Sequence, residues 1–461
     1  MELTNFIGGE FVSAESKKTF AKLSPFDGSI LAQVASSDAM DVIKALQLAK
    51  KAAAPFKELS KEQRAGLLSK IANHLEQNAD AIAYEEALYQ GLSHSFVLEN
   101  SVRPAIQLLK ENAQSLLKEI PANILLQPNG VMGVITSWCL SLKLVVERLA
   151  PALAAGNVVM LKVSEQSPIT AKILGEAMVA AQVPPGVVNI LQGFSDVAQI
   201  IAGHPSIHAV SAVGKTSTME NIAKSGLTQF KKMQLSGSVK NPAIVLAETD
   251  YKKLMPEILR PFLMGQGQLC WNVSRIFVLE SFAQDFLATA QEYISSLTPL
   301  KDPRGNEVWT PLISNESVQT IDGKIHSGVE EHGKVFVGGS RYDGPGFFYK
   351  PTVMLDLPNC SVLQQDELQG PLLLITPVKY QHEILKWANT SYLAHSGIVW
   401  GPSEKVMKVV SQLECAQVWV NSWLHGETAT IFGHKQSSFG ITDMSWSGSF
   451  YSDVKKLAGT L

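Results

Sequence analysis

Short apolar runs alternate with helical segments from residue 131 onward, and this alternation is the clearest structural pattern in the chain. An uninterrupted apolar run suits a strand that is buried on both faces, as in a parallel sheet covered by helices. The pattern therefore predicts an α/β fold whose first sheet is of the dinucleotide-binding type. The predicted strands are 131–138, 157–164, 187–193 and 207–214, with a helix at 169–181.

A second α/β series follows the first. Its predicted strands are 243–246, 275–279, 372–378 and 418–421. Two apolar segments, 120–127 and 450–461, fall outside both series, and each could be an edge strand or an arm that reaches a second subunit. Because domains typically contain roughly 100 to 200 residues, a chain of 461 residues should form two or three units.

The first hundred or so residues predict helices that follow a short N-terminal strand region. Ser60 and Gln63 have the spacing of a capping box, in which each side chain accepts a hydrogen bond from the other residue's backbone. Apolar residues then recur at helical spacing, which predicts a packed helix face. They are Leu68, Ile71, Ala72 and Leu75.

The composition is that of a folded, soluble protein, with 46% hydrophobic and 18% charged residues. Lysine and arginine number 39 against 42 aspartate and glutamate, a formal net charge of −3. Such a balance gives no long-range field for a polyanion, so a nucleic-acid partner is not expected. The richest apolar stretch, 142–160, contains Lys143, Glu147 and Arg148, so no membrane span of about 20 apolar residues is expected.

The cysteines and the N-terminus indicate a cytoplasmic protein. Residues 1–9 lack the basic-then-apolar order of a signal peptide. The four cysteines lie far apart and show no CxxC spacing, which predicts reduced thiols rather than a zinc site or a disulfide scaffold. They are Cys139, Cys270, Cys360 and Cys415.

Cys270 is the candidate for chemistry, because it follows a turn rich in glycine and glutamine, 265–268, and precedes a predicted strand. Glycines permit a close approach by the backbone, which leaves a thiol accessible. A free cysteine is also commonly a small buried hydrophobic residue. Local sequence therefore leaves open both a reactive thiol and a core position.

The segment Gly267-Gln268-Leu269-Cys270, followed by Arg275, resembles the nucleophile motif of the aldehyde dehydrogenase superfamily. The rest of the chain is similar to that family in motif order, over nearly its whole length. The further motifs are Trp138, Lys162-Val-Ser-Glu165, Pro184-Pro-Gly-Val-Val-Asn189, Val213-Gly214, Asp366-Glu367-Leu-Gln-Gly-Pro371 and Gly433-His-Lys-Gln-Ser437.

The resemblance implies three structural parts. A Rossmann-type domain that binds NAD(P) is expected over 1–115 and 134–236, and a catalytic α/β domain over 237–440. A small bridging sheet from 116–133 and 441–461 is expected to pair subunits into homodimers or homotetramers. The two apolar segments outside the alternation would then be bridging strands.

The resemblance also implies that Cys270 attacks an aldehyde, that hydride passes to the cofactor, and that a thioester is then hydrolysed. A carboxylate at Glu165 would repel a 2′-phosphate, which favours NAD over NADP and leaves NADP as the alternative. No metal ligand is expected. The implied cofactor-binding residues are Ile135, Trp138, Lys162, Ser164, Glu165, Gly193, Gly214, Lys215, Glu367 and Gln369.

Two departures from the family pattern concern catalysis directly. Cys139 stands where the family has its oxyanion-hole asparagine; a thiol is a weak donor, and loss of one such donor typically costs about 10²–10³ in rate. Gln234 stands where the family has its general base, and an amide cannot take a proton from water, a contribution worth roughly 10²–10⁴. The smaller departures are Gln369 for a phenylalanine, Lys215 for a serine and Met219 for a glycine.

Three functional interpretations follow from these departures. The first is an NAD(P)-dependent aldehyde dehydrogenase with slow thioester hydrolysis. The second is an enzyme in which coenzyme A releases the acyl group, and the third is a non-catalytic descendant that binds nucleotide or a partner.

Two further hypotheses concern the pocket of the nucleophile. If Cys139 faces Cys270, oxidation could join the two thiols and switch the site off, although Cys139 could equally be an apolar filler. Three tryptophans near the mapped site, Trp138, Trp271 and Trp423, suggest an apolar passage for an aliphatic or aromatic aldehyde, although tryptophans are also ordinary core residues.

Overall fold

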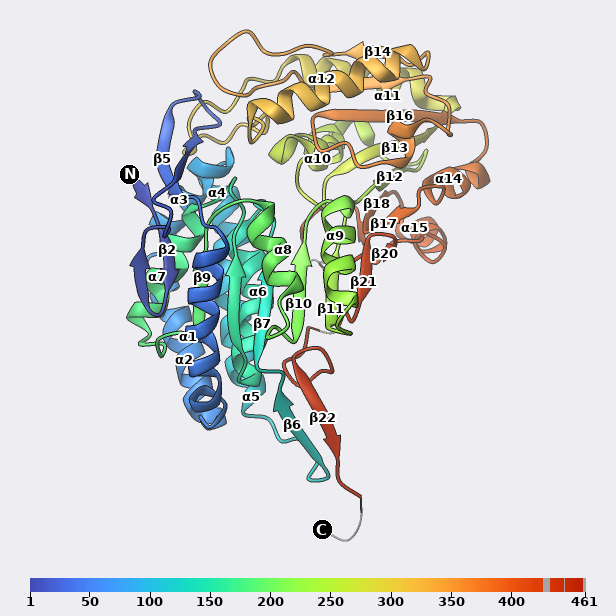
Figure 1. The fold of residues 1–461 in the computed structure, drawn as a ribbon. Coiled ribbons are helices and arrows are strands. Elements are labelled where there is room, and N and C mark those ends of the chain that lie inside the picture. The colour runs from blue at the N-terminus through green and yellow to red at the C-terminus, as the bar shows by residue number, and fades with distance from the viewer. Residues whose placement is uncertain (426–431, 443, 459–461) are drawn as a thin grey trace.

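The computed structural model describes residues 1–425, 432–442 and 444–458. Figure 1 shows two lobes, each built on a sheet, and a narrow hairpin that projects away from them. The sheet of the first lobe has the order β21-β11-β10-β7-β8-β9-β2-β3, and its five central strands, β11 to β9 in this order, are parallel. This arrangement is the α/β sheet that the apolar runs predicted.

The first sheet contains all four strands predicted for it. They are β7 (Val131–Ile135), β8 (Val158–Lys162), β9 (Val188–Leu191) and β10 (Ala209–Val213), and the sheet is completed by β2 (Asn5–Ile7), β3 (Glu10–Val12), β11 (Lys232–Ser236) and β21 (Ser438–Gly440). Every residue of β7 and β8 is buried, which explains why these runs are continuously apolar.

Helices cover both faces of the first sheet. On one face α6 packs against β7 and β8 and also contacts α2 and α5, whereas α1 and α8 pack together on the other face. The capping box of α2 is confirmed: Ser60 N donates to Gln63 Oε1 over 2.8 Å, and Gln63 N donates to Ser60 Oγ over 3.3 Å. The helices of this lobe are α1 (Ala39–Lys57), α2 (Lys61–Gln77), α3 (Ala79–Gln90), α4 (His94–Val97), the π-helical turn η1 (Leu98–Val102), α5 (Arg103–Leu116), α6 (Ser141–Ala155), α7 (Ile169–Ala180), α8 (Ser195–Gly203) and α9 (Thr216–Leu227).

Three strands of the N-terminal region form a small sheet of their own, separate from β2 and β3 of the first sheet. Its order is β1-β5-β4, with β1 parallel and β4 antiparallel to β5. The strands are β1 (Glu2–Leu3), β4 (Thr19–Leu23) and β5 (Ile30–Ala35).

The second lobe is built on a sheet of order β14-β15-β16-β13-β12-β18-β19, in which only the β14–β15 pair is antiparallel among the described strands. The predicted strands are confirmed as β12 (Asn241–Val245), β13 (Val273–Leu279), β16 (Leu372–Val378) and β19 (Gln417–Val420). The pattern missed β14 (Lys334–Val337), β15 (Thr352–Leu355) and β18 (Ser396–Trp400). A proline precedes β15 and a Ser-Gly pair opens β18, and both features shorten the apolar run.

The remaining elements cover the second sheet or connect the two lobes. The helices are α10 (Tyr251–Leu263), the 3₁₀ turn η2 (Met264–Gly267), α11 (Glu280–Ser295), α12 (Asn315–Glu330), α13 (Val362–Gln365), α14 (Gln381–Ala388) and α15 (Ser403–Val410). Two short strands, β17 (Leu393–Ala394) and β20 (His434–Lys435), pair with each other.

The two apolar segments that stood outside the alternation pair with each other. They form an antiparallel hairpin of β6 (Ile124–Pro128) and β22 (Ser452–Lys456), which projects from the lower end of the molecule in Figure 1. Leu125 and Val454 are 45% and 46% exposed on this hairpin. Residues 443 and 459–461 of the expected bridging segment lie outside the described residues.

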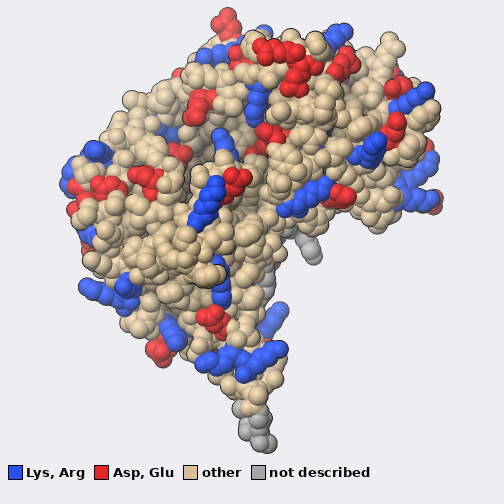
Figure 2. Space-filling view, turned by 45° about the vertical axis from the view of Figure 1, so that its right-hand side comes forward, with Lys and Arg blue, Asp and Glu red and all other residues tan. Residues whose placement is uncertain are grey.

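The molecular surface carries mixed charge. Figure 2 shows lysine and arginine interspersed with aspartate and glutamate on the face drawn, without an extended field of one sign. Over the described ranges, none of the helices has the length and apolar character needed to cross a membrane.

Candidate active site

The strand order places a crevice between β7 and β10. Along the chain β7, β8 and β9 follow one another in one direction of the sheet, whereas β10 and β11 lie on the other side of β7. Ligands of open parallel sheets bind outside the carboxyl ends of the strands at such a reversal. The segments that leave the sheet there begin at Thr136 after β7 and at Gly214 after β10.

A cavity of about 230 Å³ lies where these segments meet the second lobe. It brings together four of the predicted residues, Trp138, Glu165, Lys215 and Gln369. The lining residues that sequence reasoning missed are Ser137, Gln166, Gln268, Ile313, Ser314, Glu316, Ser317 and Thr320. Five of these eight belong to the start of α12, whose N-cap signal was visible in the sequence as Ser314 and Ser317 at capping distance.

Lys162 and Glu165 form a close pair at the carboxyl end of β8. Lys162 is buried, and its Nζ donates to Glu165 Oε2 over 2.8 Å. Lys22 of β4, which the sequence did not single out, is also buried there and donates to Gln166 Oε1 over 3.3 Å. Burial lowers the pKa of Lys22 to about 7, although the nearby Glu165 carboxylate opposes this shift.

Glu367 and Gln369 also form a pair. Gln369 Nε2 donates to Glu367 Oε2 over 2.8 Å, and Val239 N donates to Glu367 Oε1 over 3.3 Å. Burial raises the pKa of Glu367. The glutamine that replaces the family's phenylalanine is therefore a hydrogen-bond partner of the neighbouring carboxylate.

The other four predicted cofactor residues have backbone or core contacts outside the described lining of the cavity. Ile135 is buried at the end of β7. Ser164 Oγ accepts from Gln166 N over 3.2 Å, and Gly214 N donates to Ser236 O over 3.1 Å. Gly193 has a φ of +122°, and a Cβ there would lie 3.3 Å from the backbone nitrogen of Ser37. None of these four contributes to the described lining of the cavity.

Two asparagines hold the turn that carries Cys270. Asn241 Nδ2 donates to Cys270 O and to Asn272 O, both over 2.8 Å, and Asn272 Nδ2 donates to Met264 O over 2.9 Å. Gly267 is required within this turn, because a Cβ there would lie 2.2 Å from Gly370 O. The glycine-rich segment therefore serves a close backbone contact, as its composition predicted.

A buried carboxylate, Glu86, holds the segment that leads from Cys139 into α6. Glu86 Oε1 accepts from Leu142 N over 3.1 Å, from Ser101 over 3.0 Å and from Gln90 over 2.9 Å. Gln90 Oε1 in turn accepts from Leu140 N over 2.9 Å, where Leu140 adopts a left-handed φ of 46°. This network fixes the start of α6 and therefore the position of the preceding Cys139.

The thiols of Cys139 and Cys270 form a hydrogen bond with each other. Cys139 is 5% exposed and Cys270 is half-buried. The hydrogen bond from Cys270 lowers the pKa of Cys139, whereas burial and the same hydrogen bond raise the pKa of Cys270. The two thiols therefore form a coupled pair in which the hydrogen bond favours ionisation of Cys139.

Gln234 lies inside the first sheet, in β11, and is fully buried. Its Oε1 accepts from Ser211 Oγ over 2.8 Å and from Tyr451 OH over 3.3 Å. The carboxamide is thus held as a neutral acceptor by two hydroxyl groups.

The tryptophans expected along a substrate passage occupy different environments. Trp138 lines the cavity described above, whereas Trp271 is fully buried. Trp423 Nε1 donates to Trp271 O over 3.0 Å and its ring stacks on Phe96 at 6.2 Å between centroids.

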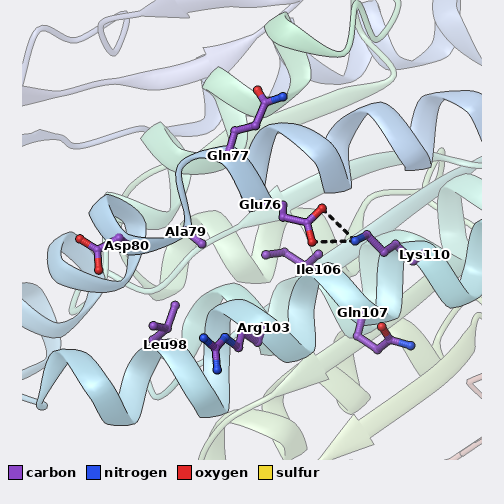
Figure 3. A pocket seen from close by; sticks show the side chains of 9 residues that line it. All are labelled: Glu76, Gln77, Ala79, Asp80, Leu98, Arg103, Ile106, Gln107 and Lys110. Carbon is purple, nitrogen blue, oxygen red and sulfur yellow. Dashed lines mark hydrogen bonds and ion pairs between the residues drawn. The ribbon is translucent and has the colours of Figure 1, made fainter.

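A wider hollow of about 610 Å³ lies elsewhere, between α2 and α5. Figure 3 shows its lining and the two contacts between Glu76 and Lys110, which measure 2.8 and 2.9 Å. None of the residues predicted for catalysis or cofactor binding lines this hollow. Its opposing charges are already paired, so it is a weaker candidate than the cavity between the lobes.

Comparisons with a family model and with known proteins indicate the same family. The family model described as the aldehyde dehydrogenase family matches residues 11–457. The 2-hydroxymuconic semialdehyde dehydrogenase of Pseudomonas sp. (strain CF600) is 30% identical over 99% of both chains. Human retinaldehyde dehydrogenase 3 is 31% identical over 98% of this chain and 91% of its own.

A solved structure gives the same result for the fold. The NAD⁺ complex of an aldehyde dehydrogenase from Bacillus cereus superimposes with a TM-score of 0.91 at 27% identity, covering 99% of this chain and 96% of that one. Sequence motifs, sheet order and the cavity between the lobes thus agree with the comparisons, and the chain belongs to the aldehyde dehydrogenase family.

Proposed function

We propose that the protein oxidises an aldehyde to a carboxylic acid with NAD(P)⁺, using Cys270 as the nucleophile. The observation that carries this proposal is the hydrogen-bonded pair of Cys139 and Cys270 beside the cavity between the lobes. Trp138 and Gln268, which lie next to these cysteines in the sequence, line that cavity. Membership of the aldehyde dehydrogenase family supports the reaction class.

The residues around the cavity fit a dinucleotide. Lys162 and Glu165 would bind ribose hydroxyls, Lys215 at the start of α9 would bind the pyrophosphate, and Glu367 would bind the nicotinamide ribose. The Glu165 side chain is 34% exposed and lines the cavity, so it would repel a 2′-phosphate and favour NAD over NADP. When bound, the cofactor supplies the hydride acceptor for the oxidation.

Cys139 takes a role that an asparagine could not. Because the hydrogen bond with Cys270 lowers the pKa of Cys139, we assign to a Cys139 thiolate the proton that Cys270 loses on attacking the aldehyde carbon. The Cys139 thiol that results then donates, weakly, to the oxygen of the tetrahedral intermediate. Attack is thereby assisted, while stabilisation of the oxyanion is smaller than an amide would give.

Release of the acid is the slow step in this proposal. Gln234 cannot accept a proton from the hydrolytic water, and its oxygen is already engaged by Ser211 and Tyr451. We therefore expect a rapid burst of one NADH per Cys270 when enzyme, NAD⁺ and an aldehyde are mixed in a stopped-flow instrument, followed by a slow steady state. Full-rate turnover without a burst would contradict slow hydrolysis.

The other two interpretations separate in the same experiment. Steady-state turnover that requires added coenzyme A would identify acyl transfer to that thiol. Nucleotide binding without any NADH would identify a non-catalytic binding protein and end the enzymatic proposal.

The projecting hairpin supports assembly into a homo-oligomer. Leu125 and Val454 expose about half of their surfaces on it, and an unpaired two-stranded ribbon is marginally stable in water. We propose that 116–133 and 441–461 pair subunits, beside a cofactor domain of 1–115 and 134–236 and a catalytic domain of 237–440. Sedimentation should show a dimer or tetramer that dissociates in Leu125→Lys; a wild-type monomer would contradict this.

The cytoplasm is the proposed location. All four cysteines are free, which suits a reducing compartment. Fractionation of cells that express the protein at natural levels tests this assignment.

A further inference from the structure

A buried lysine from the small N-terminal sheet reaches residues that line the cavity between the lobes. Lys22 belongs to β4 and is 3% exposed. Its Nζ donates to Oε1 of Gln166 over 3.3 Å, and both Gln166 and the neighbouring Glu165 line the cavity. Buried lysines are rare because the ammonium loses its hydration, so the position of Lys22 needs a physical explanation.

The fold fixes Lys22 at the edge of the first sheet where a nucleotide is expected. Phe20 and Lys22 are two residues apart in β4, so their side chains leave the same face of the strand. The Phe20 ring lies 4.7 Å from the ring of Phe194, which follows β9, and Lys22 contacts Gln166, which follows β8. This face of β4 therefore lies against the segments that leave the carboxyl ends of two parallel strands, where ligands of such sheets bind.

The hydrogen bond from Lys22 also fixes the amide of Gln166. An ammonium group only donates, so the amide oxygen faces Lys22 and the NH₂ group is left for a different acceptor. Glu165, the next residue along the chain, is an acceptor that already receives a hydrogen bond from Lys162 over 2.8 Å. The lining thus contains a fixed donor next to a fixed acceptor.

Two lysines flank the Glu165 carboxylate, and the charge of one of them varies near neutral pH. Burial lowers the pKa of Lys22 to about 7, and Glu165, the charged group that acts on Lys22 among the described residues, opposes this shift. Lys162 is bound to the same carboxylate. Two ammonium groups and one carboxylate give a net charge of +1 when Lys22 is protonated, and of zero when it is neutral.

We propose that Lys22 is a specificity-determining residue of the nucleotide site, where its ammonium offsets the Glu165 carboxylate and allows a 2′-phosphate to bind. The site then accepts NADP⁺ as well as NAD⁺, which limits the preference for NAD that Glu165 alone would give. This inference rests on the proposed function, because it assumes that Glu165 faces the adenosine ribose. Lys22 is a positioning residue, since it acts through Gln166 and Glu165, and it lies outside the sequence motifs that resemble the family.

Electrostatics explains why Lys22 should discriminate between the two cofactors. A phosphate monoester carries a charge of about −1.5 to −2 at neutral pH, whereas a ribose hydroxyl is uncharged. Glu165 and Lys162 alone present a neutral pair to the phosphate, and protonated Lys22 adds a full opposite charge in a region that excludes water. Removal of this charge should therefore weaken NADP⁺ much more than NAD⁺.

Binding measurements test the inference without any turnover. NAD⁺ and NADP⁺ are titrated into the protein by calorimetry at about pH 6, where Lys22 with its pKa of about 7 is protonated. Lys22→Met should weaken NADP⁺ about tenfold and change the affinity for NAD⁺ by less than about threefold. Lys18→Met is the matched control, because Lys18 lies on the same segment with an exposed side chain. Equal changes for the two nucleotides in Lys22→Met would overturn the proposal.

The pH profile of the unaltered protein gives a second measurement that needs no substitution. Lys22 loses its proton as pH rises through about 7, so the affinity for NADP⁺ should fall between about pH 6 and pH 8 while that for NAD⁺ stays nearly constant. The 2′-phosphate itself loses a proton near pH 6 and adds to this trend. The profile of Lys22→Met supplies that baseline, and identical NADP⁺ profiles in the two proteins would contradict a role for Lys22.

A conservative variant makes the opposite prediction to the deletion of the charge. Lys22→Arg keeps a positive charge throughout this pH range, so at about pH 8 it should bind NADP⁺ more tightly than the wild type does. Misfolding cannot produce a loss in Lys22→Met together with a gain in Lys22→Arg. If both variants lose NADP⁺ affinity equally, the charge of Lys22 is not what admits the phosphate.

Two outcomes separate this inference from the proposed function. Formation of NADH from NAD⁺ and an aldehyde, with NADP⁺ affinity unaffected by Lys22→Met, would reject the role of Lys22 and leave the proposed function standing. Binding of NADP⁺ that depends on Lys22, with no reduced cofactor formed from any aldehyde, would reject the proposed function and leave a nucleotide site with the stated specificity.

Discussion

The two sides of the candidate active site satisfy their polar groups in different ways. On the cofactor side, Lys162 binds Glu165 and Gln369 binds Glu367, both over 2.8 Å. The acyl side is the part of the site that contains Cys139, Cys270 and the buried charges of α6. There, Lys143 and Arg148 lie 3.8 and 3.9 Å from Glu147. The cofactor side is therefore internally paired before any ligand arrives, whereas the acyl side contains buried donors that lack partners among the described residues.

This difference indicates where the chain departs functionally from its family. Its Lys-x-Ser-Glu and Glu-x-x-Gly-Pro elements contribute to the satisfied pairs, and Gln369, a departure from the family pattern, completes the pair with Glu367. Of the two catalytic departures, Cys139 lies near the buried charge of Arg148, whereas Gln234 lies inside the first sheet. We infer that nucleotide binding was retained and that the chemistry around the substrate changed.

The largest expected effect comes from removing the nucleophile. Cys270→Ala should lower NADH formation by at least about 10⁴-fold, because no other described group is placed to form the thioester. Nucleotide affinity should stay within about twofold, since Cys270 contributes no cofactor contact in the proposal. Steady-state absorbance and calorimetry measure the two quantities, and Cys360→Ser is the matched control on the surface. Unchanged activity in Cys270→Ala would remove the proposed mechanism.

Mild oxidation should abolish the activity that depends on Cys270 and leave the residues of the cofactor side unchanged. The hydrogen-bonded thiols of Cys139 and Cys270 can each lose one hydrogen to hydrogen peroxide, which forms one disulfide and two molecules of water. Intact mass should fall by two hydrogens, activity should be lost, and dithiothreitol should restore both. Cys139→Ser should show neither the cross-link nor the reversible loss, and four free thiols in peroxide-treated wild type would contradict the prediction.

The Glu86 hydrogen-bond network, which holds the start of α6, should contribute strongly to the free energy of unfolding. Glu86→Ala removes the acceptor of Leu142 N and Ser101 Oγ and one of the three acceptors of Gln90 Nε2, and we expect a loss of about 3 kcal/mol in the free energy of unfolding. Glu86→Gln keeps the accepting oxygen, and the unpartnered Glu86 Oε2 becomes the amide nitrogen. Urea unfolding measures both variants; equal losses would show that the accepting oxygen is unimportant.

The pH dependence of the Glu86 variants follows from burial. Burial raises the pKa of Glu86, so the folded protein favours the protonated carboxyl. Its stabilising contribution is complete below the ordinary carboxyl pKa and is lost as pH rises through the raised value. Glu86→Gln resembles the protonated form, so it should match wild type in acid and become relatively more stable as pH rises.

Sequence reasoning succeeded where the signal was local or family-wide. The continuous apolar runs gave four strands of each sheet, and the Ser60 capping box was correct to the hydrogen bond. It could not find Lys22 or the Glu86 network, because each depends on residues that only the fold brings together. The sequence shows that an apolar stretch is interrupted by Lys143, Glu147 and Arg148, but it does not reveal that all three are buried.

The sequence motifs of the cofactor side do not distinguish residues that line the cavity from residues that only support the backbone. The resemblance implied the same role for all ten cofactor residues, but the structure separates those that line the cavity from those, such as Gly193, that allow close backbone packing. A motif contains both kinds, because a family retains a backbone constraint as readily as a ligand contact.

The smallest expected effect tests the cofactor side directly. Lys162→Met removes a buried cation that binds Glu165 over 2.8 Å, and NAD⁺ affinity should fall about tenfold, as loss of one charged hydrogen bond predicts. Lys44→Met is the matched control, because Lys44 pairs with Glu15 on the exposed surface and such pairs contribute little. Titration of each variant with NAD⁺ by fluorescence gives both dissociation constants. If Lys162→Met binds as tightly as Lys44→Met, the pair at the end of β8 is structural and the cofactor lies elsewhere.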